Sequence, residues 1–115
     1  MKKLFVLSLI FLASNSLISK AFGAQKESEK EYLIQIKDHK FEPANIEVLA
    51  GEKFKLIVEN LDPTLEEFES NDLKKEKLIS GNKKVSIVIN PLKSGEYKFF
   101  GDFHQKTAQG KIIAK

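Results

Sequence analysis

Apolar and polar residues alternate with a period of two through most of the chain from residue 32 onward. The clearest runs lie at residues 45–49, 53–60 and 84–89. In the second run, Phe54 and Leu56 fall on the same face. A period of two is typical of β-strands that bury one face. No stretch of this region has the periodicity of a convincing helix.

Shorter apolar segments extend the set of expected strands. They lie at residues 32–37, 41–44, 65–70 and 78–79, with charged and irregular residues 71–77 before the last of them. Pro43 cannot donate a hydrogen bond to a strand ladder, so the second of these segments is predicted to be an edge or crossover segment.

The C-terminal region predicts a strand, an irregular loop and a closing strand. Tyr97 and Phe99 alternate with polar neighbours, the loop occupies residues 101–110, and residues 112–113 are apolar again. In total, about seven or eight short strands with turns between them predict an all-β sandwich. We expect one domain over residues 32–115, with no internal repeat.

The N-terminal region has a different pattern. A basic start precedes an apolar run at residues 4–13, and a small-x-small pattern follows at residues 21–23. These features predict a signal peptide at residues 1–23, export to the periplasm and no membrane span after cleavage; an uncleaved membrane anchor is the alternative. The polar residues 24–31 predict a flexible leader.

The charge of the chain depends on that cleavage. The full sequence has a formal net charge of +3, with 19 basic and 16 acidic residues. Removing Lys2, Lys3 and Lys20 leaves 19 − 3 = 16 basic residues, so the processed chain is near neutral. The sequence contains no arginine, which is the preferred reader of phosphates and guanine edges. We therefore expect no nucleic-acid partner.

Candidate chemistry is concentrated in the C-terminal loop and in an acidic stretch at residues 62–72. The loop contains Asp102 and His104, and the acidic stretch contains Glu66 and Glu67. Two residues apart, Asp102 and His104 would share a face if the strand continued. Each feature also has a simpler interpretation, as a half-buried loop histidine or as solvated surface charge. The second histidine of the chain, in a turn at position 39, is interpreted as a surface residue rather than an accessory ligand.

Sulfur ligands are absent from the expected mature protein. The chain has no cysteine, and Met1, its only methionine, would leave with the signal peptide. A metal in this protein would therefore depend on carboxylate and imidazole donors.

Two motifs resemble those of the cupredoxins. The first is F-x-P-x-x-I-x-V-x-x-G at residues 41–51, and the second is the G-E-Y-x-F framework that begins at Gly95 and leads to G-K-I at residues 110–112. The resemblance covers nearly the whole region from Tyr32 onward. It implies a cupredoxin-like Greek-key β-sandwich.

The resemblance also implies where metal ligands would lie. A blue-copper cupredoxin supplies one histidine from a mid-chain loop, then cysteine, histidine and usually methionine from the last loop. In this sequence Glu67 stands at the mid-chain position, Gly101 at the cysteine position, His104 at the loop histidine and Thr107 near the methionine. Without a thiolate the chain is not expected to be a blue-copper electron carrier, and without sulfur it is a poor Cu(I) carrier.

The remaining donor set is Glu67, Asp102 and His104, with Glu66 as an additional candidate. Such ligands suit Cu(II), Fe, Mn or Zn. The chain is similar to the EfeO-type cupredoxin-like domains of periplasmic iron-uptake systems, in which the blue-copper ligands are also replaced. That similarity implies binding of Cu(II) or Fe in support of iron or copper acquisition. A periplasmic iron-binding protein or a membrane iron permease would then be the partner.

Two other functional classes remain open. The sandwich could have lost the metal and serve as an interaction module of a periplasmic transport complex, using an exposed edge strand. An enzyme is not expected, because the sequence has no nucleophile motif and no cofactor fingerprint.

Overall fold

A computed structural model describes residues 29–115, and within this range the protein is all-β, as predicted. The strands are β1 (Lys30–Lys37), β2 (Lys40–Glu42), β3 (Asn45–Val48), β4 (Phe54–Asn60), β5 (Glu66–Ser70), β6 (Lys75–Ile79), β7 (Lys84–Ile89), β8 (Gly95–Gly101) and β9 (Gln109–Ala114). Asp102–His104 form a single 3-10 turn, η1. None of the described residues belongs to a helix that is long and apolar enough to cross a membrane.

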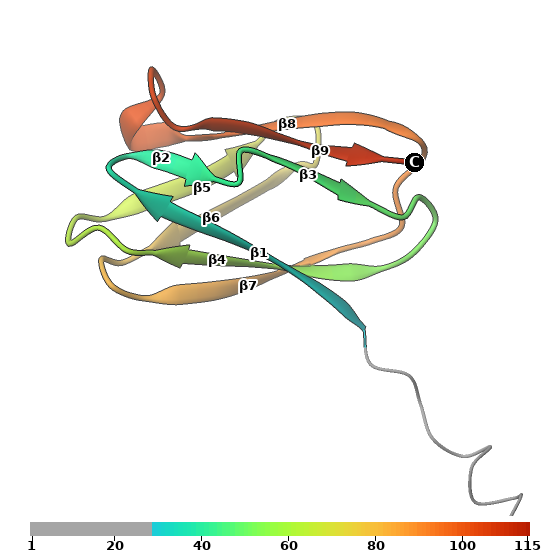
Figure 1. The fold of residues 1–115 in the computed structure, drawn as a ribbon, viewed down its shortest axis with the longest axis horizontal. Coiled ribbons are helices and arrows are strands. Elements are labelled where there is room, and N and C mark those ends of the chain that lie inside the picture. The colour runs from blue at the N-terminus through green and yellow to red at the C-terminus, as the bar shows by residue number, and fades with distance from the viewer. Residues whose placement is uncertain (1–28) are drawn as a thin grey trace, which may run out of the picture.

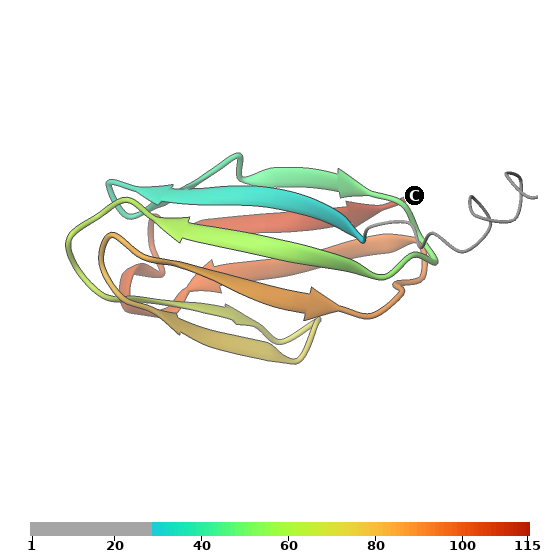
Figure 2. The same cartoon turned by 90° about the horizontal axis from the view of Figure 1, so that it is seen from below.

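The strands form two sheets that pack face to face (Figures 1 and 2). One sheet has the order β2-β1-β4-β7, and the other has the order β3-β9-β8-β5-β6. The pairs β1–β4 and β3–β9 are parallel, and the remaining pairs are antiparallel. Sequence neighbours are therefore often in different sheets, which brings distant loops together at the ends of the sandwich.

The core lies between the sheets and consists of the inward positions of the alternating strands. Phe54, Leu56 and Val58 of β4 are buried, as their spacing predicts. Phe99 is the centre of an aromatic group, with its ring 5.0 Å from that of Phe41 and 5.1 Å from that of Phe68. Each fully buried side chain of this size stabilises the fold by roughly 1.5–3 kcal/mol.

Three strands begin earlier than the sequence predicts, and one of them is β9, which starts at Gln109 inside the expected loop 101–110. β1 starts at Lys30, inside the expected leader, because its first residues pair in parallel with β4, where Lys30 lies opposite Phe54. The predicted signal peptide at residues 1–23 and residues 24–28 of the predicted leader lie outside the described residues. β6 starts at Lys75, within the segment expected to be irregular, because it pairs with β5 as an edge strand. Edge strands tolerate exposed lysine and glutamate side chains, so charge alone did not exclude a strand there.

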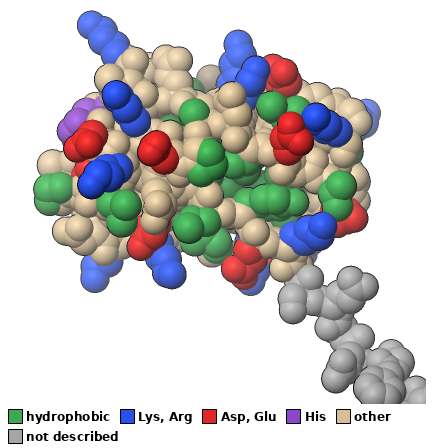
Figure 3. Space-filling view, in the orientation of Figure 1, with side chains coloured by type: hydrophobic (Ala, Val, Ile, Leu, Met, Phe, Trp, Pro, Cys, Tyr) green, Lys and Arg blue, Asp and Glu red, His purple; other side chains and the backbone are tan. Residues whose placement is uncertain are grey.

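Four connections gather at one end of the sandwich, opposite the C-terminus (Figure 1). They are the β1–β2 turn, the β4–β5 loop, the β6–β7 turn and the segment from η1 to β9. Histidine side-chain atoms are exposed to solvent at this end, next to acidic and basic side chains (Figure 3). The chain contains only two histidines, His39 and His104, and both belong to these connections.

Candidate metal centre

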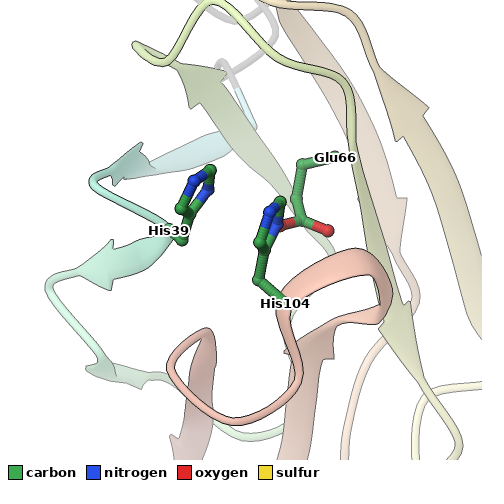
Figure 4. Close-up of side chains that lie close together, drawn as sticks. All are labelled: His39, Glu66 and His104. Carbon is green, nitrogen blue, oxygen red and sulfur yellow. The ribbon is translucent and has the colours of Figure 1, made fainter.

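Three side chains of the metal-ligand type meet at this end of the sandwich. They are His39, Glu66 and His104, and one ligand atom from each lies within 4.8 Å of the others. Figure 4 shows the two imidazole rings side by side, with the Glu66 carboxylate next to the His104 ring. The ring centroids are 3.5 Å apart and the ring planes differ by 13°.

His39 is placed by a tight turn between β1 and β2. Asp38 and His39 both have positive φ values, 52° and 59°, as in the two-residue turns of β-hairpins. Such values are uncommon outside glycine, so the turn needs support from its surroundings. The Asp62 carboxylate accepts hydrogen bonds from both backbone N–H groups, at 2.8 and 2.9 Å. The Thr107 hydroxyl donates to the His39 carbonyl at 2.6 Å.

Asp62 is held in turn by Asn60, which is fully buried at the end of β4. The Asn60 side chain accepts a hydrogen bond from the Asp62 backbone N–H at 3.0 Å and donates to the carbonyls of Thr64 and Ile79. Burial would raise the pKa of the Asp62 carboxyl, but hydrogen bonds from the His39 and Asp38 backbone and the two nearby imidazoles together lower it below its ordinary value. Asp62 therefore stays ionised beside His39, whose Nδ1 lies 3.5 Å from its Oδ2.

Glu66 is the most buried acidic residue of the site, with 1% of its surface exposed. Its Oε1 accepts hydrogen bonds at 2.9 Å from the backbone N–H groups of Glu67 and Phe103. Its Oε2 lies 2.6 Å from Nδ1 of His104. A buried carboxylate is stable only when it is paired and hydrogen-bonded in this way.

Gly101 provides the space for the Glu66 carboxylate. A Cβ atom at this position would lie 2.8 Å from Cδ and 2.9 Å from Oε2 of Glu66, and 2.8 Å from Cβ of Ala108. Gly101 lies opposite Phe68 in the β5–β8 pairing, so the carboxylate of Glu66 fills the region that a side chain at position 101 would occupy.

His104 ends the 3-10 turn that follows β8. Its carbonyl accepts hydrogen bonds from the backbone N–H groups of Thr107 and Ala108, at 3.2 and 2.8 Å, which closes the loop. Its side chain is 30% exposed, against 40% for His39 and 2% for Glu66. Both rings are therefore open to solvent while the carboxylate is not.

Comparison with known proteins identifies the framework. Residues 4–114 match the family described as "Cupredoxin-like domain". The chain belongs to this cupredoxin-like family. A protein of Rickettsia prowazekii (strain Madrid E), described as uncharacterized, is 48% identical over 115 residues, which cover 97% of this chain and 92% of the relative.

Solved structures share the cupredoxin-like fold at low sequence identity. The metal-binding domain of CopA from Streptococcus pneumoniae D39, a Cu(I)-exporting P-type ATPase, has a TM-score of 0.69 at 16% identity, over 80% of this chain and 91% of that domain. Auracyanin A, a blue copper protein of Chloroflexus aurantiacus, has a TM-score of 0.65 at 15% identity, over 76% and 100%. Amicyanin from Paracoccus versutus has a TM-score of 0.57 at 14% identity, over 81% and 87%.

The donor set of this cupredoxin-like site differs from that of a blue-copper centre. It contains no thiolate, because the chain has no cysteine, and a blue-copper centre depends on the copper–thiolate bond. Thr107, expected near the methionine position, uses its hydroxyl to bind the backbone of His39. Two imidazoles beside a carboxylate do fit Cu(II), Zn or Fe, which accept nitrogen and oxygen ligands.

The predicted site residues of this cupredoxin-like fold lie on two different sides of strand β5. Among the described residues, Glu67 does not form a ligand group with Asp102 and His104; it lies instead with Glu69 and Glu76. The strand alternates, so Glu66 shares the buried face with Phe68 while Glu67 points to the other side. The grouping of Glu67, Asp102 and His104 expected from the resemblance is therefore not formed.

Asp102 is separated from His104 by the 3-10 turn. The two residues were expected to share a face if the strand continued, but β8 ends at Gly101 and the backbone then turns. The Asp102 carboxylate accepts a hydrogen bond from Gln105. Desolvation first, then repulsion from the outer glutamates and from Asp102, raise the pKa of the Glu67 carboxyl. Asp102 thus faces the outer, acidic side of β5.

His39 is the site residue that the sequence pattern favours as a surface residue over an accessory ligand. Its side chain is 40% exposed, but the structure also stacks it on His104. No local pattern indicates this contact, since His39 precedes the motif that starts at Phe41. The position of Glu66 did have a local signal, because it shares a strand face with Phe68.

Proposed function

We propose that this protein is an exported, cupredoxin-like metal-binding protein that binds Cu(II) or Fe at the site formed by His39, Glu66 and His104. The observation that carries the proposal is the convergence of two half-exposed imidazoles, one from the β1–β2 turn and one from η1, with a buried carboxylate at the start of β5. Histidines open to solvent can exchange a metal ion with the medium or with a partner. We infer that the site supports iron or copper acquisition, as the similarity to EfeO-type domains suggests.

Two considerations favour copper as the first metal to test. Imidazole nitrogen binds Cu(II) more strongly than the other divalent first-row ions, following the Irving–Williams order. The structural neighbours described by name bind copper, and they share this fold. Iron remains the alternative, because imidazole also suits iron and the resemblance to domains of iron-uptake systems points to it.

The proposed setting follows from the N-terminal sequence. A basic start and an apolar run at residues 4–13 support export to the periplasm. There the protein would bind a metal ion and transfer it to a periplasmic iron-binding protein or a membrane iron permease. We propose no enzymatic activity.

Calorimetric titration of the purified protein with Cu(II), and with Fe(II) under anaerobic conditions, tests this function. We expect one ion per chain, with affinity reduced at least tenfold in His39→Ala and in His104→Ala. Affinity should also weaken as the pH falls, because only a neutral imidazole binds metal. Glu67→Gln is the matched control and should bind as the parent does, since Glu67 lies on the opposite face of β5. If both alanine variants bind as tightly as the parent, the assigned site is wrong.

A second function, a metal-free interaction module, is supported by apolar side chains at the same end of the sandwich. Leu61 and Leu65 of the β4–β5 loop and Phe103 of η1 are 40%, 44% and 47% exposed. These residues offer a contact surface for a protein partner. Elemental analysis of protein isolated from its own cellular compartment distinguishes the two functions, because the module should contain no stoichiometric metal.

A further inference from the structure

From the contacts of the two carboxylates, we infer that Glu66 and Asp62 are positioning residues rather than metal ligands. Each carboxylate faces Nδ1 of one histidine, so the Nε2 atoms of His39 and His104 are left to bind the metal. The assignment of Nε2 as the ligand atom rests on the proposed function. The inference that the carboxylates orient the rings is independent of the proposed function, and it can be tested in the metal-free protein.

Glu66 has no free oxygen in this structure. Oε1 accepts hydrogen bonds from two backbone N–H groups, and such bonds favour the ionised carboxylate. An ionised carboxylate can only accept, so the short 2.6 Å contact requires that His104 donates a proton from Nδ1. A neutral imidazole that has its proton on Nδ1 has its lone pair on Nε2. Glu66 therefore fixes both the ring orientation and the tautomer of His104.

Coordination by Glu66 itself would disturb this arrangement. A metal on Oε2 would displace the hydrogen bond to His104, inside a region where the carboxylate side chain is only 2% exposed. The ring of His104 is 30% exposed, so it can reach an ion from solvent without that loss. A histidine that donates its second ring N–H to a carboxylate is the usual arrangement around a bound metal.

Asp62 repeats the arrangement at His39. Its two oxygens accept hydrogen bonds from the backbone N–H groups of Asp38 and His39, and its Oδ2 lies 3.5 Å from Nδ1 of the His39 ring. Both carboxylates thus bind two backbone N–H groups and face the Nδ1 side of a ring. The looser contact and the 40% exposure of the His39 side chain leave this ring freer to rotate than that of His104.

The near-parallel stack explains why such freedom matters. The two rings differ by only 13°, so lone pairs that lie in their planes run side by side rather than toward one point. A single ion can bind both rings only after one of them turns. His104 is held by its short hydrogen bond, so His39 is the ring expected to move.

The first test is a measurement of the histidine tautomers in the metal-free protein. Long-range 1H–15N correlation spectra recorded above the titration of both rings should show His104 protonated at Nδ1 and unprotonated at Nε2. Glu66→Gln should shift this ring toward a mixture of tautomers, and Glu67→Gln should leave it unchanged. A parent protein with the His104 proton on Nε2 would overturn the role assigned to Glu66, whatever metal the site binds.

The second test uses Zn(II) as a diamagnetic probe in the same spectra. We expect the Nε2 resonances of His39 and His104 to move on binding while Nδ1 of His104 keeps its proton. Glu66→Gln should reduce Zn(II) affinity by about 10–100-fold with the one-to-one stoichiometry retained, as for partners that orient a ligand. Loss of the Nδ1 proton on binding would show that Glu66 or Nδ1 is a ligand and overturn the inference. A parent that binds none of Zn(II), Cu(II) and Fe(II) would refute the proposed function and the Nε2 assignment, while the tautomer spectra would still decide the role of Glu66.

Discussion

Two neighbouring glutamates of β5 show how strongly the surroundings decide the behaviour of one side chain. Glu66 faces inward, is 1% exposed, and receives hydrogen bonds from two backbone N–H groups in addition to its contact with His104. Glu67 faces outward beside Glu69 and Glu76. Partial desolvation, repulsion from Glu76, Glu69 and Asp102, and a hydrogen bond with Asp102 raise the pKa of the Glu67 carboxyl. The charge of the buried Glu66 carboxylate is therefore stabilised by hydrogen bonds, whereas the charge of the more exposed Glu67 carboxylate is opposed by its acidic neighbours.

Proximity of metal-ligand residues alone therefore does not define a site, because the groups that donate hydrogen bonds to a carboxylate decide how it is held. The outer acidic cluster, formed by Glu67, Glu69 and Glu76, brings three carboxylates within ligand distance of one another. Among the described residues, this cluster contains no imidazole. The inner site has two imidazoles, and its carboxylate accepts two backbone hydrogen bonds. Three substitutions test this contrast, beginning with the one expected to have the largest effect.

Replacing Glu66 by alanine should have the largest effect on stability. The change leaves two backbone N–H groups and the Nδ1–H of His104 without an acceptor in a buried place, so we expect a loss of about 3 kcal/mol in the free energy of unfolding. Urea denaturation of the metal-free protein at neutral pH measures it. Glu67→Ala serves as the control and should not destabilise the protein. Equal losses in the two variants would show that the inner and outer faces do not differ as described.

Gly101→Ala should have an intermediate effect, although an alanine in a strand is normally more favourable than a glycine. The added Cβ would come within 2.9 Å of the Glu66 carboxylate and of Ala108, which we expect to cost about 2 kcal/mol of unfolding free energy through overpacking. The same variant should displace Oε2 from His104 and loosen the His104 tautomer in the NMR spectra. In the double variant with Glu66→Ala, part of the cost should disappear, because the two positions are in contact. A Gly101→Ala protein more stable than the parent would contradict the packing described here.

Glu67→Gln should have the smallest effect and the opposite sign. The pKa of the Glu67 carboxyl is higher in the folded protein than in the unfolded chain. Its ionised form therefore destabilises the folded state at pH values above the folded-state pKa, and this destabilisation is absent below the pKa of the unfolded chain. The variant should therefore melt at a slightly higher temperature than the parent at neutral pH. The difference should shrink as the pH falls through the raised pKa of Glu67. Thermal melts of both proteins between mildly acidic and neutral pH measure the trend, and a gap that widens toward acidic pH would refute it.

Most of the fold follows from the sequence because its signals are local. The alternation of Phe54, Leu56 and Val58 predicts a strand and its buried face, and both are found. β6 was harder to predict because it lies at the edge of its sheet and is held by backbone pairing with β5. Its side chains at Glu76 and Lys77 face solvent and give no apolar pattern.

The site was predicted less completely because it depends on contacts between distant segments. His104 could be chosen from its loop, but its stacking partner His39 comes from a different sheet and a strained turn without the usual Asn-Gly sequence. For the glutamate, the resemblance selected Glu67 and left Glu66 as an additional candidate, whereas in the structure Glu66 is the one on the buried face of β5. A 3-10 turn then separated Asp102 from His104, which a strand-based spacing cannot anticipate.

The hydrogen bond from Thr107 to His39 has a consequence for the unfolding of the whole domain. It joins segments that are 68 positions apart and that belong to different sheets. An ion shared by His39 and His104 would connect the same two segments much more firmly, like a reversible cross-link in a protein that has no disulfide. The lifetime of the folded chain would then depend on the concentration of metal around it, and scarcity of metal would make the protein easier for proteases to remove.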